Sequence, residues 1–532
     1  RRWIEGALAR VFDSGTEPTP TLSLVARWQD LGHTPPGVAV ADDEDEAWTA
    51  ALALAAGRGQ PIVWVKRTLV GRVDGAMQQT AAARLVEQIE TGCERTGLSW
   101  RETGDAIESV AICLNTAVKL RAEFGENARE RFALTDLVGR HDALGAGRLK
   151  PSERWAWAGQ ITGDAASAAY QAMCSLFYEP GAAWLFDGYP DEQPWNTFDA
   201  SRAAELFESA GFDTSIVDTP RGTHDGWLLS SARAIRADVV MVNSKGRPQD
   251  FALTSGTGSY RDAPTLGMPP VVYFVHSWSA TQPANRKTVA GRWRERGAFA
   301  YVGSVHEPFL QAFVPTPAVA GRLLSGVPLA AAVRADSPGA LWKITVLGDP
   351  LLVFAKPRSR SDADLPLVGR DIGRELSEVV NTGAFAAAIK RMVMTGKDED
   401  AVEFAAAVLA DRRDKFDADL AESVALAAFR VADTRVLVAA VEVLGPARAE
   451  VTGAADALWQ HAEPLLQGAV GGELAVTLRA NLREGTVVRD AIRLARAMHN
   501  TGDAAGANGV LTEAERRVEK ATDVQRLRAE RR

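Results

Sequence analysis

The sequence predicts an α/β protein with a mostly parallel sheet flanked by helices, followed by an all-α C-terminal helical array. Three segments carry this prediction: 237–246, 271–280 and 297–304 each run as an apolar strand into small, polar residues. A continuous apolar run of this length is typical of a strand buried on both faces. Helix-length connections favour parallel pairing, and parallel strands end at one edge of their sheet. We therefore expect one cleft at that edge.

Residues 1–76 predict a small α/β subdomain ahead of this sheet. Strands are expected at 36–42 and 61–65, joined by a helix over 42–56. The helix would begin in the acidic run 42–46, because carboxylates complement the dipole at a helix N-terminus. We interpret the run as a solvated helix start, since it lacks the ligand spacing of a calcium loop.

Residues 77–180 predict a helical segment. Its apolar residues recur at helical spacing and glycines punctuate them, as in Leu85, Ile89, Ile107, Val110, Cys113, Leu114, Val118 and Leu120. The three cysteines, at 93, 113 and 174, all fall in stretches that resemble helices. We expect them to be buried structural thiols.

The main α/β domain is expected over 181–357. It would open with a strand at 182–187, a helix at 199–210 and a second, parallel strand at 214–218. A strand, a helical crossover and a parallel strand form the right-handed unit of such sheets. The last strand is expected at 342–347, and the glycine-rich stretch 246–267 predicts a long loop over the cleft.

A charged linker over 358–370 separates this domain from an α-helical, repeat-like domain over 371–532. The stretch 491–507 has the helix, turn and helix form of tetratricopeptide-like repeats, without a fixed period. Such arrays usually bind other proteins on a concave face, so we expect this part to contact a protein partner. The alternative is a purely structural role in packing.

Composition limits the function classes. A formal net charge of −8 gives no basic face for nucleic acid, and no apolar run approaches the length of a membrane span. Three cysteines allow no disulfide framework, which favours a reducing compartment such as the cytoplasm. The chain opens on Arg1 rather than Met, so we expect it to be part of a longer protein, and a missing signal peptide is uninformative.

Common cofactor signatures are missing from the sequence. It contains no Gly-rich phosphate loop ending in Gly-Lys-Ser/Thr, no dinucleotide motif, no Cys-x-x-Cys and no His-Glu-x-x-His. His276 and His306, with Glu307, follow two of the expected strands and could bind a metal or transfer protons. We interpret them as hydrogen-bonded residues of the cleft, and expect neither a metal nor a cofactor.

The segments 296–304, Arg-Gly-Ala-Phe-Ala-Tyr-Val-Gly-Ser, and 347–351, Leu-Gly-Asp-Pro-Leu, with the two strands before them, resemble the catalytic domain of gingipain-type cysteine peptidases. This family belongs to the caspase-fold group, and the resemblance covers residues 181–356. It implies a first α/β subdomain ahead of the catalytic one. It also implies one strand that ends in His-Gly and a next strand whose small polar residue precedes the nucleophilic cysteine.

Both positions of that dyad are substituted in this chain. Lys245–Gly246 stands where the family has His-Gly, and Ser277–Trp278 stands where it has the nucleophile. Peptide cleavage by a cysteine peptidase needs a thiolate and a base, and an indole supplies neither. We expect Trp278 to be more than half buried against the loop after Gly246, with Lys245 close to its ring or to an acidic neighbour.

Two functions follow from these residues. The first is a non-catalytic pseudopeptidase whose cleft, with Gly246, His276, His306 and Glu307, binds a peptide or protein partner. The second is a hydrolase with substituted chemistry. In that alternative Ser277 or Ser279 is the nucleophile and Lys245 is the base, or His276 takes that role. A Ser–Lys pair requires a buried lysine with a lowered pKa.

Overall fold

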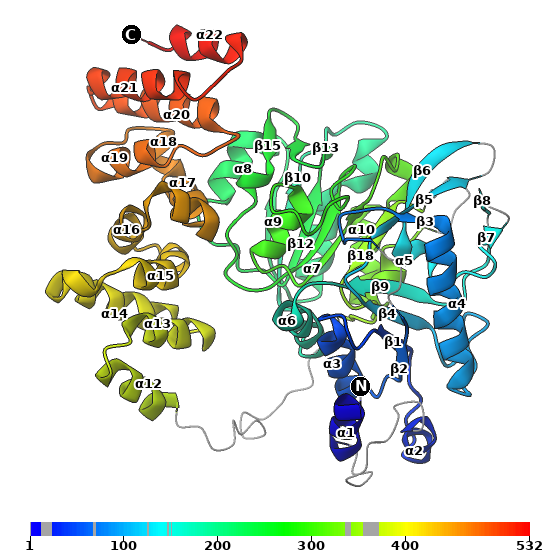
Figure 1. Cartoon of the computed structure of the whole chain (residues 1–532). Coiled ribbons are helices and arrows are strands. Elements are labelled where there is room, and N and C mark those ends of the chain that lie inside the picture. Colours follow the sequence, from blue (N-terminus) through cyan, green and yellow to red (C-terminus); the bar gives the residue numbers. More distant parts are fainter. Residues whose placement is uncertain are drawn as a thin grey trace. The chain divides into compact units, whose positions relative to one another are not determined.

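The computed structural model describes residues 2–11, 24–66, 71–124, 127–145, 148–150, 152–335, 342–354 and 372–531 (Figure 1). They form two compact units. The first consists of Arg1–His224, Arg236–Tyr260 and Met268–Pro357, and the second of Asp225–Ile235, Arg261–Gly267 and Arg358–Arg532. The predicted linker over 358–370 lies outside the described residues.

The first unit is built on a ten-stranded sheet, with strands β1 (Val38–Ala41), β2 (Ile62–Trp64), β4 (Ser109–Cys113), β9 (Trp157–Ile161), β10 (Ala182–Asp187), β11 (Asp213–Val217), β12 (Val239–Asn243), β16 (Val271–Val275), β17 (Ala300–Ser304) and β18 (Ile344–Leu347). Their order is β11-β10-β12-β16-β17-β18-β9-β4-β1-β2. Neighbouring strands are parallel, apart from β17 and β18. The predicted mostly parallel sheet is confirmed.

The three strands that carry the prediction, β12, β16 and β17, are neighbours in parallel register. Asn243 pairs with Val275, and Val271 pairs with Ala300. The carboxyl ends of these strands therefore meet at one edge of the sheet, as expected from their apolar runs.

Helices cover both faces of this part of the sheet. The core on one face joins Tyr273 and Val275 of β16 to α7 (Ala200–Ser209) and α10 (Thr316–Leu324). On the other face, Phe274 contacts Trp293 of α9 (Val289–Glu295), with ring centroids 6.3 Å apart. Alternate residues of one strand are thus buried on opposite sides, which explains its uninterrupted apolar sequence.

Strands β1, β2, β4 and β9 form the other half of the sheet, with α3 (Trp48–Arg58), α4 (Gln79–Arg95) and α6 (Ala165–Leu176). Because β18 is antiparallel to β17 and parallel to β9, the two halves run in opposite directions. Other helices of the unit are α1 (Arg2–Val11), α2 (Val25–Asp30), α5 (Leu134–Leu137) and α11 (Leu329–Ala332).

The prediction of helices throughout 77–180 is wrong. Besides β4 and β9, this part contains a second sheet of β3 (Met77–Gln78), β5 (Lys119–Phe124), β6 (Asn127–Ala133), β7 (Leu144–Gly145) and β8 (Arg148–Leu149). The apolar run 110–114 has residues three and four apart, but it is a strand buried on both faces. Short apolar runs fit either structure by spacing alone.

Three smaller expectations also change. Cys113 lies in strand β4, whereas Cys93 and Cys174 lie in helices. Helix α3 begins at Trp48, after the acidic run, and Asp45 is buried and accepts hydrogen bonds from Asn115. The stretch 246–267 is not one long loop. It contains most of a three-stranded antiparallel sheet of β13 (Lys245–Arg247), β14 (Asp250–Ala252) and β15 (Thr257–Ser259).

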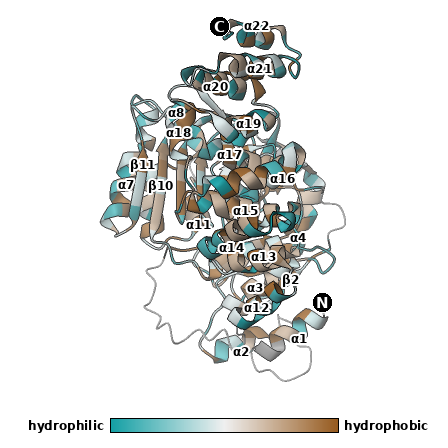
Figure 2. Cartoon of the chain, turned by 90° about the vertical axis from the view of Figure 1, so that its left-hand side faces the viewer, coloured by the Kyte–Doolittle hydropathy of each residue, from teal (hydrophilic) through white to brown (hydrophobic). Residues whose placement is uncertain are grey.

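The second unit confirms the helical C-terminal prediction. Its helices are α12 (Ile372–Asn381), α13 (Phe385–Met394), α14 (Asp398–Asp411), α15 (Ala418–Val431), α16 (Thr434–Thr452), α17 (Ala454–His461), α18 (Glu463–Leu466), α19 (Gly472–Ala480), α20 (Val487–Asn500), α21 (Ala504–Glu515) and α22 (Ala521–Ala529). In Figure 2 these helices mix hydrophobic and hydrophilic residues along their length. That pattern is typical of helices with one buried stripe.

The helical unit also contains two segments from the middle of the chain. We had expected both of these segments to belong to the α/β domain. The first, 225–235, contains most of α8 (His224–Ser230), and the second is 261–267. Buried Trp227 donates to the carbonyl of Asp262 at 2.7 Å, and Arg489 of α20 binds the Asp262 carboxylate through two 2.7 Å contacts. Such bidentate pairs are among the strongest polar contacts in proteins.

A buried carboxylate surrounded by arginines stabilises the first unit. Asp136 of α5 contacts Arg154 at 2.6 Å, Arg140 at 3.1 Å and Arg334 at 3.6 Å. Burial by itself would raise the pKa of Asp136, but the three guanidinium groups outweigh it and lower that pKa to about 2. The charged form of Asp136 is therefore strongly favoured in the folded chain.

We predict that Asp136→Asn lowers the stability of the first unit by about 3–5 kcal/mol, since it leaves three buried cations without their carboxylate. An unfolded aspartate titrates near pH 3.9, so the stability that Asp136 contributes is complete above that pH and is lost as the pH falls towards 2. Thermal unfolding against pH measures both effects. Glu87→Gln, at an exposed position of α4, is the control and should change neither. An unchanged melting temperature for Asp136→Asn would contradict the assignment.

Candidate functional site

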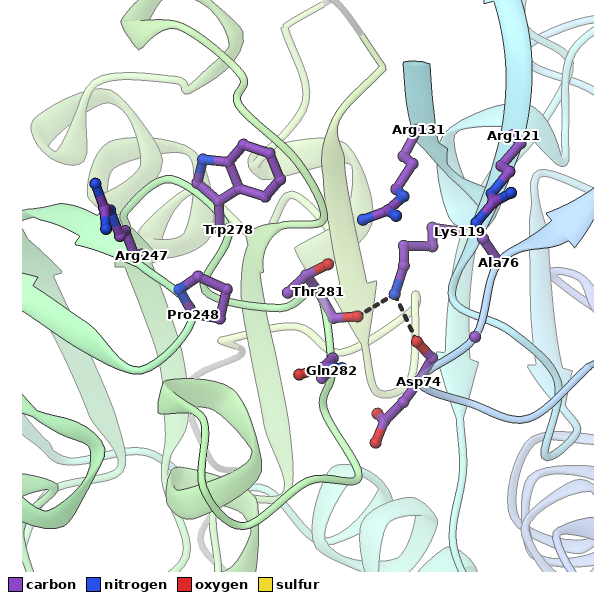
Figure 3. A pocket seen from close by; sticks show the side chains of 11 residues that line it. Asp74, Ala76, Lys119, Arg121, Arg131, Arg247, Pro248, Trp278, Thr281 and Gln282 are labelled. Atoms are coloured by element: carbon purple, nitrogen blue, oxygen red, sulfur yellow. Dashed lines mark hydrogen bonds between the residues drawn. The ribbon is translucent and has the colours of Figure 1, made fainter. Parts of the chain in front are cut away.

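A cavity of about 570 Å³ lies beside Trp278, just after the end of strand β16. Its lining comes from both halves of the first unit (Figure 3), namely Asp74, Gly75, Ala76, Lys119, Arg121, Arg131, Arg247, Pro248, Trp278, Thr281 and Gln282. The volume falls within the usual range for ligand sites. The cavity lies beyond the carboxyl ends of β12 and β16, and Trp278 forms part of its wall. Gly246, His276, His306 and Glu307, which the sequence placed in the cleft, are not among its lining residues.

Trp278 is held in a strained conformation. Its φ of +66° lies in the left-handed region, which bulky residues rarely adopt. The indole Nε1 donates to Glu307 Oε2 at 3.2 Å, and the ring lies 4.1 Å from the His306 ring, centroid to centroid. Trp278 is more than half buried, as expected. Backbone strain of this kind persists only where surrounding contacts fix it, and it is concentrated at functional sites.

Glu307 connects the residues at this strand end. Its carboxylate accepts a hydrogen bond from the indole of Trp278 and a second one from the hydroxyl of Ser277, at 3.0 Å. Burial lowers the pKa of the adjacent His306, and Lys343 adds to that effect. Ser277, Trp278, His306 and Glu307 are thus brought together, as the sequence indicated.

The other candidate nucleophile and base are buried below this surface. Ser279 is fully buried, and its hydroxyl lies 3.4 Å from the backbone nitrogen of Ser304. His276 is 1 % exposed and donates from Nε2 to the carbonyl of Arg247 at 3.0 Å. Burial lowers the pKa of His276 to about 4, so the ring is neutral near pH 7. A methyl group at Gly246 would lie 2.7 Å from the His276 ring, so this close packing requires glycine.

Lys245 does not take the predicted position near Trp278 or an acidic neighbour. Its side chain is exposed, and its ammonium lies over the ring of Trp195 at 5.2 Å. Among the described residues it forms no ion pair. This is the geometry of a cation–π contact.

A buried lysine forms the floor of the cleft. Lys119 of β5 is 3 % exposed and donates to the carbonyl of Asp74 at 2.8 Å and to the carbonyl of Thr281. Burial lowers the pKa of Lys119 to about 8, and Arg131 adds to that effect. The Asp74 carboxylate in turn accepts the backbone N–H of Ala284 at 2.8 Å. These bonds fix the segments on which the cavity depends.

Three arginines complete the walls of the cavity. Arg121 of β5 and Arg131 of β6 lie on one side in Figure 3, whereas Arg247 of β13 lies on the other side, near Trp278. Among the described residues, no ion pair joins any of these three guanidinium groups to a carboxylate. In the described part of the chain, the cavity lining therefore has four cations and a single carboxylate, that of Asp74.

Sequence analysis missed Lys119, Arg121 and Arg131, because the segment that contains them was taken as helical. The signal was present: in Lys119-Leu-Arg-Ala122, charged residues alternate with apolar ones. Leu120 and Ala122 are buried, and period-two alternation is typical of a strand with one buried face. The position of these cations opposite Trp278 comes from pairing between distant segments, which local spacing does not reveal.

We predict that Trp278→Gly is more stable than Trp278→Ala by about 1 kcal/mol, because glycine adopts a φ of +66° without the steric cost that a Cβ brings. Melting temperatures of the two variants measure the difference. Trp184 in strand β10 supplies the matched pair, and there alanine should be the more stable residue, because glycine weakens strands. Equal melting temperatures at position 278 would contradict the strained geometry.

Several further observations bear on the site. No group of three or more His, Cys, Asp or Glu side chains within the described ranges could hold a metal ion. None of the helices in the described residues has the length and apolar character that a membrane span requires. Comparison of the chain with protein-family models, curated proteins and solved structures found no match.

Proposed function

We propose that the first unit is a non-catalytic, caspase-fold relative of gingipain-type cysteine peptidases, and that its cleft binds a peptide without cleaving it. The observation that carries this proposal is the indole of Trp278 in the cavity wall, at the position where the resemblance expects the nucleophilic cysteine. An indole cannot attack a carbonyl group. It does offer a rigid apolar surface of the kind that anchors ligand side chains.

Two features of the sheet support the resemblance. Lys245–Gly246 and Ser277–Trp278 follow the neighbouring parallel strands β12 and β16, as the two dyad positions do in that family. A first group of strands, β1, β2, β4 and β9, also precedes the group that contains the site. Because one fold can serve many functions, the chemistry of the site has to decide between binding and catalysis.

That chemistry weighs against the hydrolase alternative. Ser277 is bonded to the carboxylate of Glu307, and Ser279 has no exposed surface for a substrate to reach. Lys245 is exposed and its ammonium lies over the ring of Trp195. His276 is buried beneath β13, with its Nε2 occupied by a carbonyl. An activated nucleophile needs a base within hydrogen-bonding distance. Among the described residues, neither Lys245 nor His276, the two bases that this alternative names, forms a hydrogen bond with Ser277 or Ser279.

The second unit is proposed to recruit a protein partner, as helical arrays commonly do. A groove of about 510 Å³ supports this, with a lining drawn from α14, α16 and α19. Leu409, Val438 and Leu474 supply its apolar part, and Arg435 and Glu473 supply charges. This part of the proposal is independent of the cleft in the first unit.

We predict that the chain retains members of a library of random octapeptides and releases them intact, as judged by mass spectrometry. Trp278→Ala should weaken retention about tenfold or more, because it removes a large apolar contact that contributes about 2 kcal/mol. Trp3→Ala is the matched control, since Trp3 is exposed and lies outside the cavity.

Cleavage of library peptides at defined bonds would overturn the proposal. If that cleavage disappeared in Ser277→Ala or Lys245→Ala, the hydrolase alternative would replace the proposed binding function. Retention that is equal in wild type and Trp278→Ala would remove the cleft from the account, even if peptides bind elsewhere on the chain.

A further inference from the structure

We infer that the cleft selects acidic peptides, with side-chain carboxylates bound by Arg121, Arg131 and Arg247 and an adjacent apolar side chain packed on Trp278. This inference rests on the proposed peptide-binding function and names its ligand class. It depends on a second observation, the charge of the residues that line the cavity.

The charge of the lining differs in sign from that of the whole chain. The chain has a formal net charge of −8, whereas the described residues of the cavity lining include four cations and one anion, Asp74. Asp74 is engaged by the N–H of Ala284. Like charges brought together in one concave site repel each other, and an anionic ligand relieves that repulsion. An acidic ligand is therefore attracted to this cavity in particular.

The guanidinium N–H groups of the three arginines can donate hydrogen bonds to a ligand. Arg121 and Arg247 are exposed and Arg131 is half-buried, and among the described residues none of them has a carboxylate partner. A guanidinium group binds a carboxylate through two parallel hydrogen bonds. Lys119 is different, because two carbonyl groups already accept from its ammonium. We assign the binding role to the arginines and a positioning role to Lys119.

The arrangement of the charges favours a peptide over a compact anion. Arg121 and Arg131 lie on the wall opposite Trp278, and Arg247 lies on the same side as the indole (Figure 3). A single phosphate or carboxylate is bound by donors that converge on one point. Cations on two walls instead suit a ligand whose negative charges are spaced along a chain, with a hydrophobic group between them. The cavity of about 570 Å³ accommodates a few side chains of such a ligand.

The test is selection from a library of random octapeptides by the full chain at low salt, followed by sequencing of the retained peptides. Asp and Glu should be enriched over Asn and Gln. The affinity of a selected peptide should fall about tenfold in Arg121→Gln and in Arg131→Gln, since each removes a charge-assisted hydrogen bond. It should also fall as salt is raised. Arg84→Gln, on the exposed face of α4, is the matched control and should bind normally.

The outcomes separate this inference from the function on which it rests. Peptides that bind through Trp278 with no acidic enrichment, and with unchanged affinity in the arginine variants, would overturn the inference and leave the peptide-binding function standing. If no peptide is retained, the peptide-binding function fails and the inference fails with it. If AMP or inorganic phosphate binds in an arginine-dependent way while no peptide does, the cavity is a site for small anions and the peptide assignment is wrong.

Discussion

The cleft depends on one buried cation, Lys119. Its ammonium joins the carbonyl groups of Asp74 and Thr281, which belong to segments more than two hundred residues apart in the sequence. Burial of a charge with carbonyl partners costs free energy that a neutral residue would not, and the lowered pKa of Lys119 reflects that cost. The lysine connects the floor of the cavity to the loop after Trp278. The walls of the cleft are held together by this contact.

On this floor the two walls have different chemistry. The strand end after β16 presents Trp278 in a left-handed conformation that Glu307 and His306 stabilise. The opposite wall presents Arg121 and Arg131 from the smaller sheet. One wall combines the rigid indole with the guanidinium group of Arg247, and the other carries the guanidinium groups of Arg121 and Arg131. We propose that a site built in this way discriminates between ligands by charge and shape and breaks no bond.

Much of the fold followed from local sequence patterns. The uninterrupted apolar runs around Val240, Phe274 and Val302 identify strands buried on both faces, and those strands are parallel neighbours. The cationic wall could not be found in the same way. Lys119 and Arg121 are ordinary surface residues by local pattern, and only strand pairing between distant segments brings them to Trp278. The position of Lys245 over Trp195 was missed for a similar reason, because a long side chain can turn towards either of two aromatic rings.

The most direct test of the account is a crystal structure of the chain with a bound acidic octapeptide. An intact peptide should lie between the indole of Trp278 and the guanidinium groups of Arg121 and Arg131, with its carboxylates within hydrogen-bonding distance of the arginines. Electron density for a cleaved peptide, or for an ester on Ser277, would contradict a binding role. A peptide bound away from this cavity would contradict the assignment of the cleft itself.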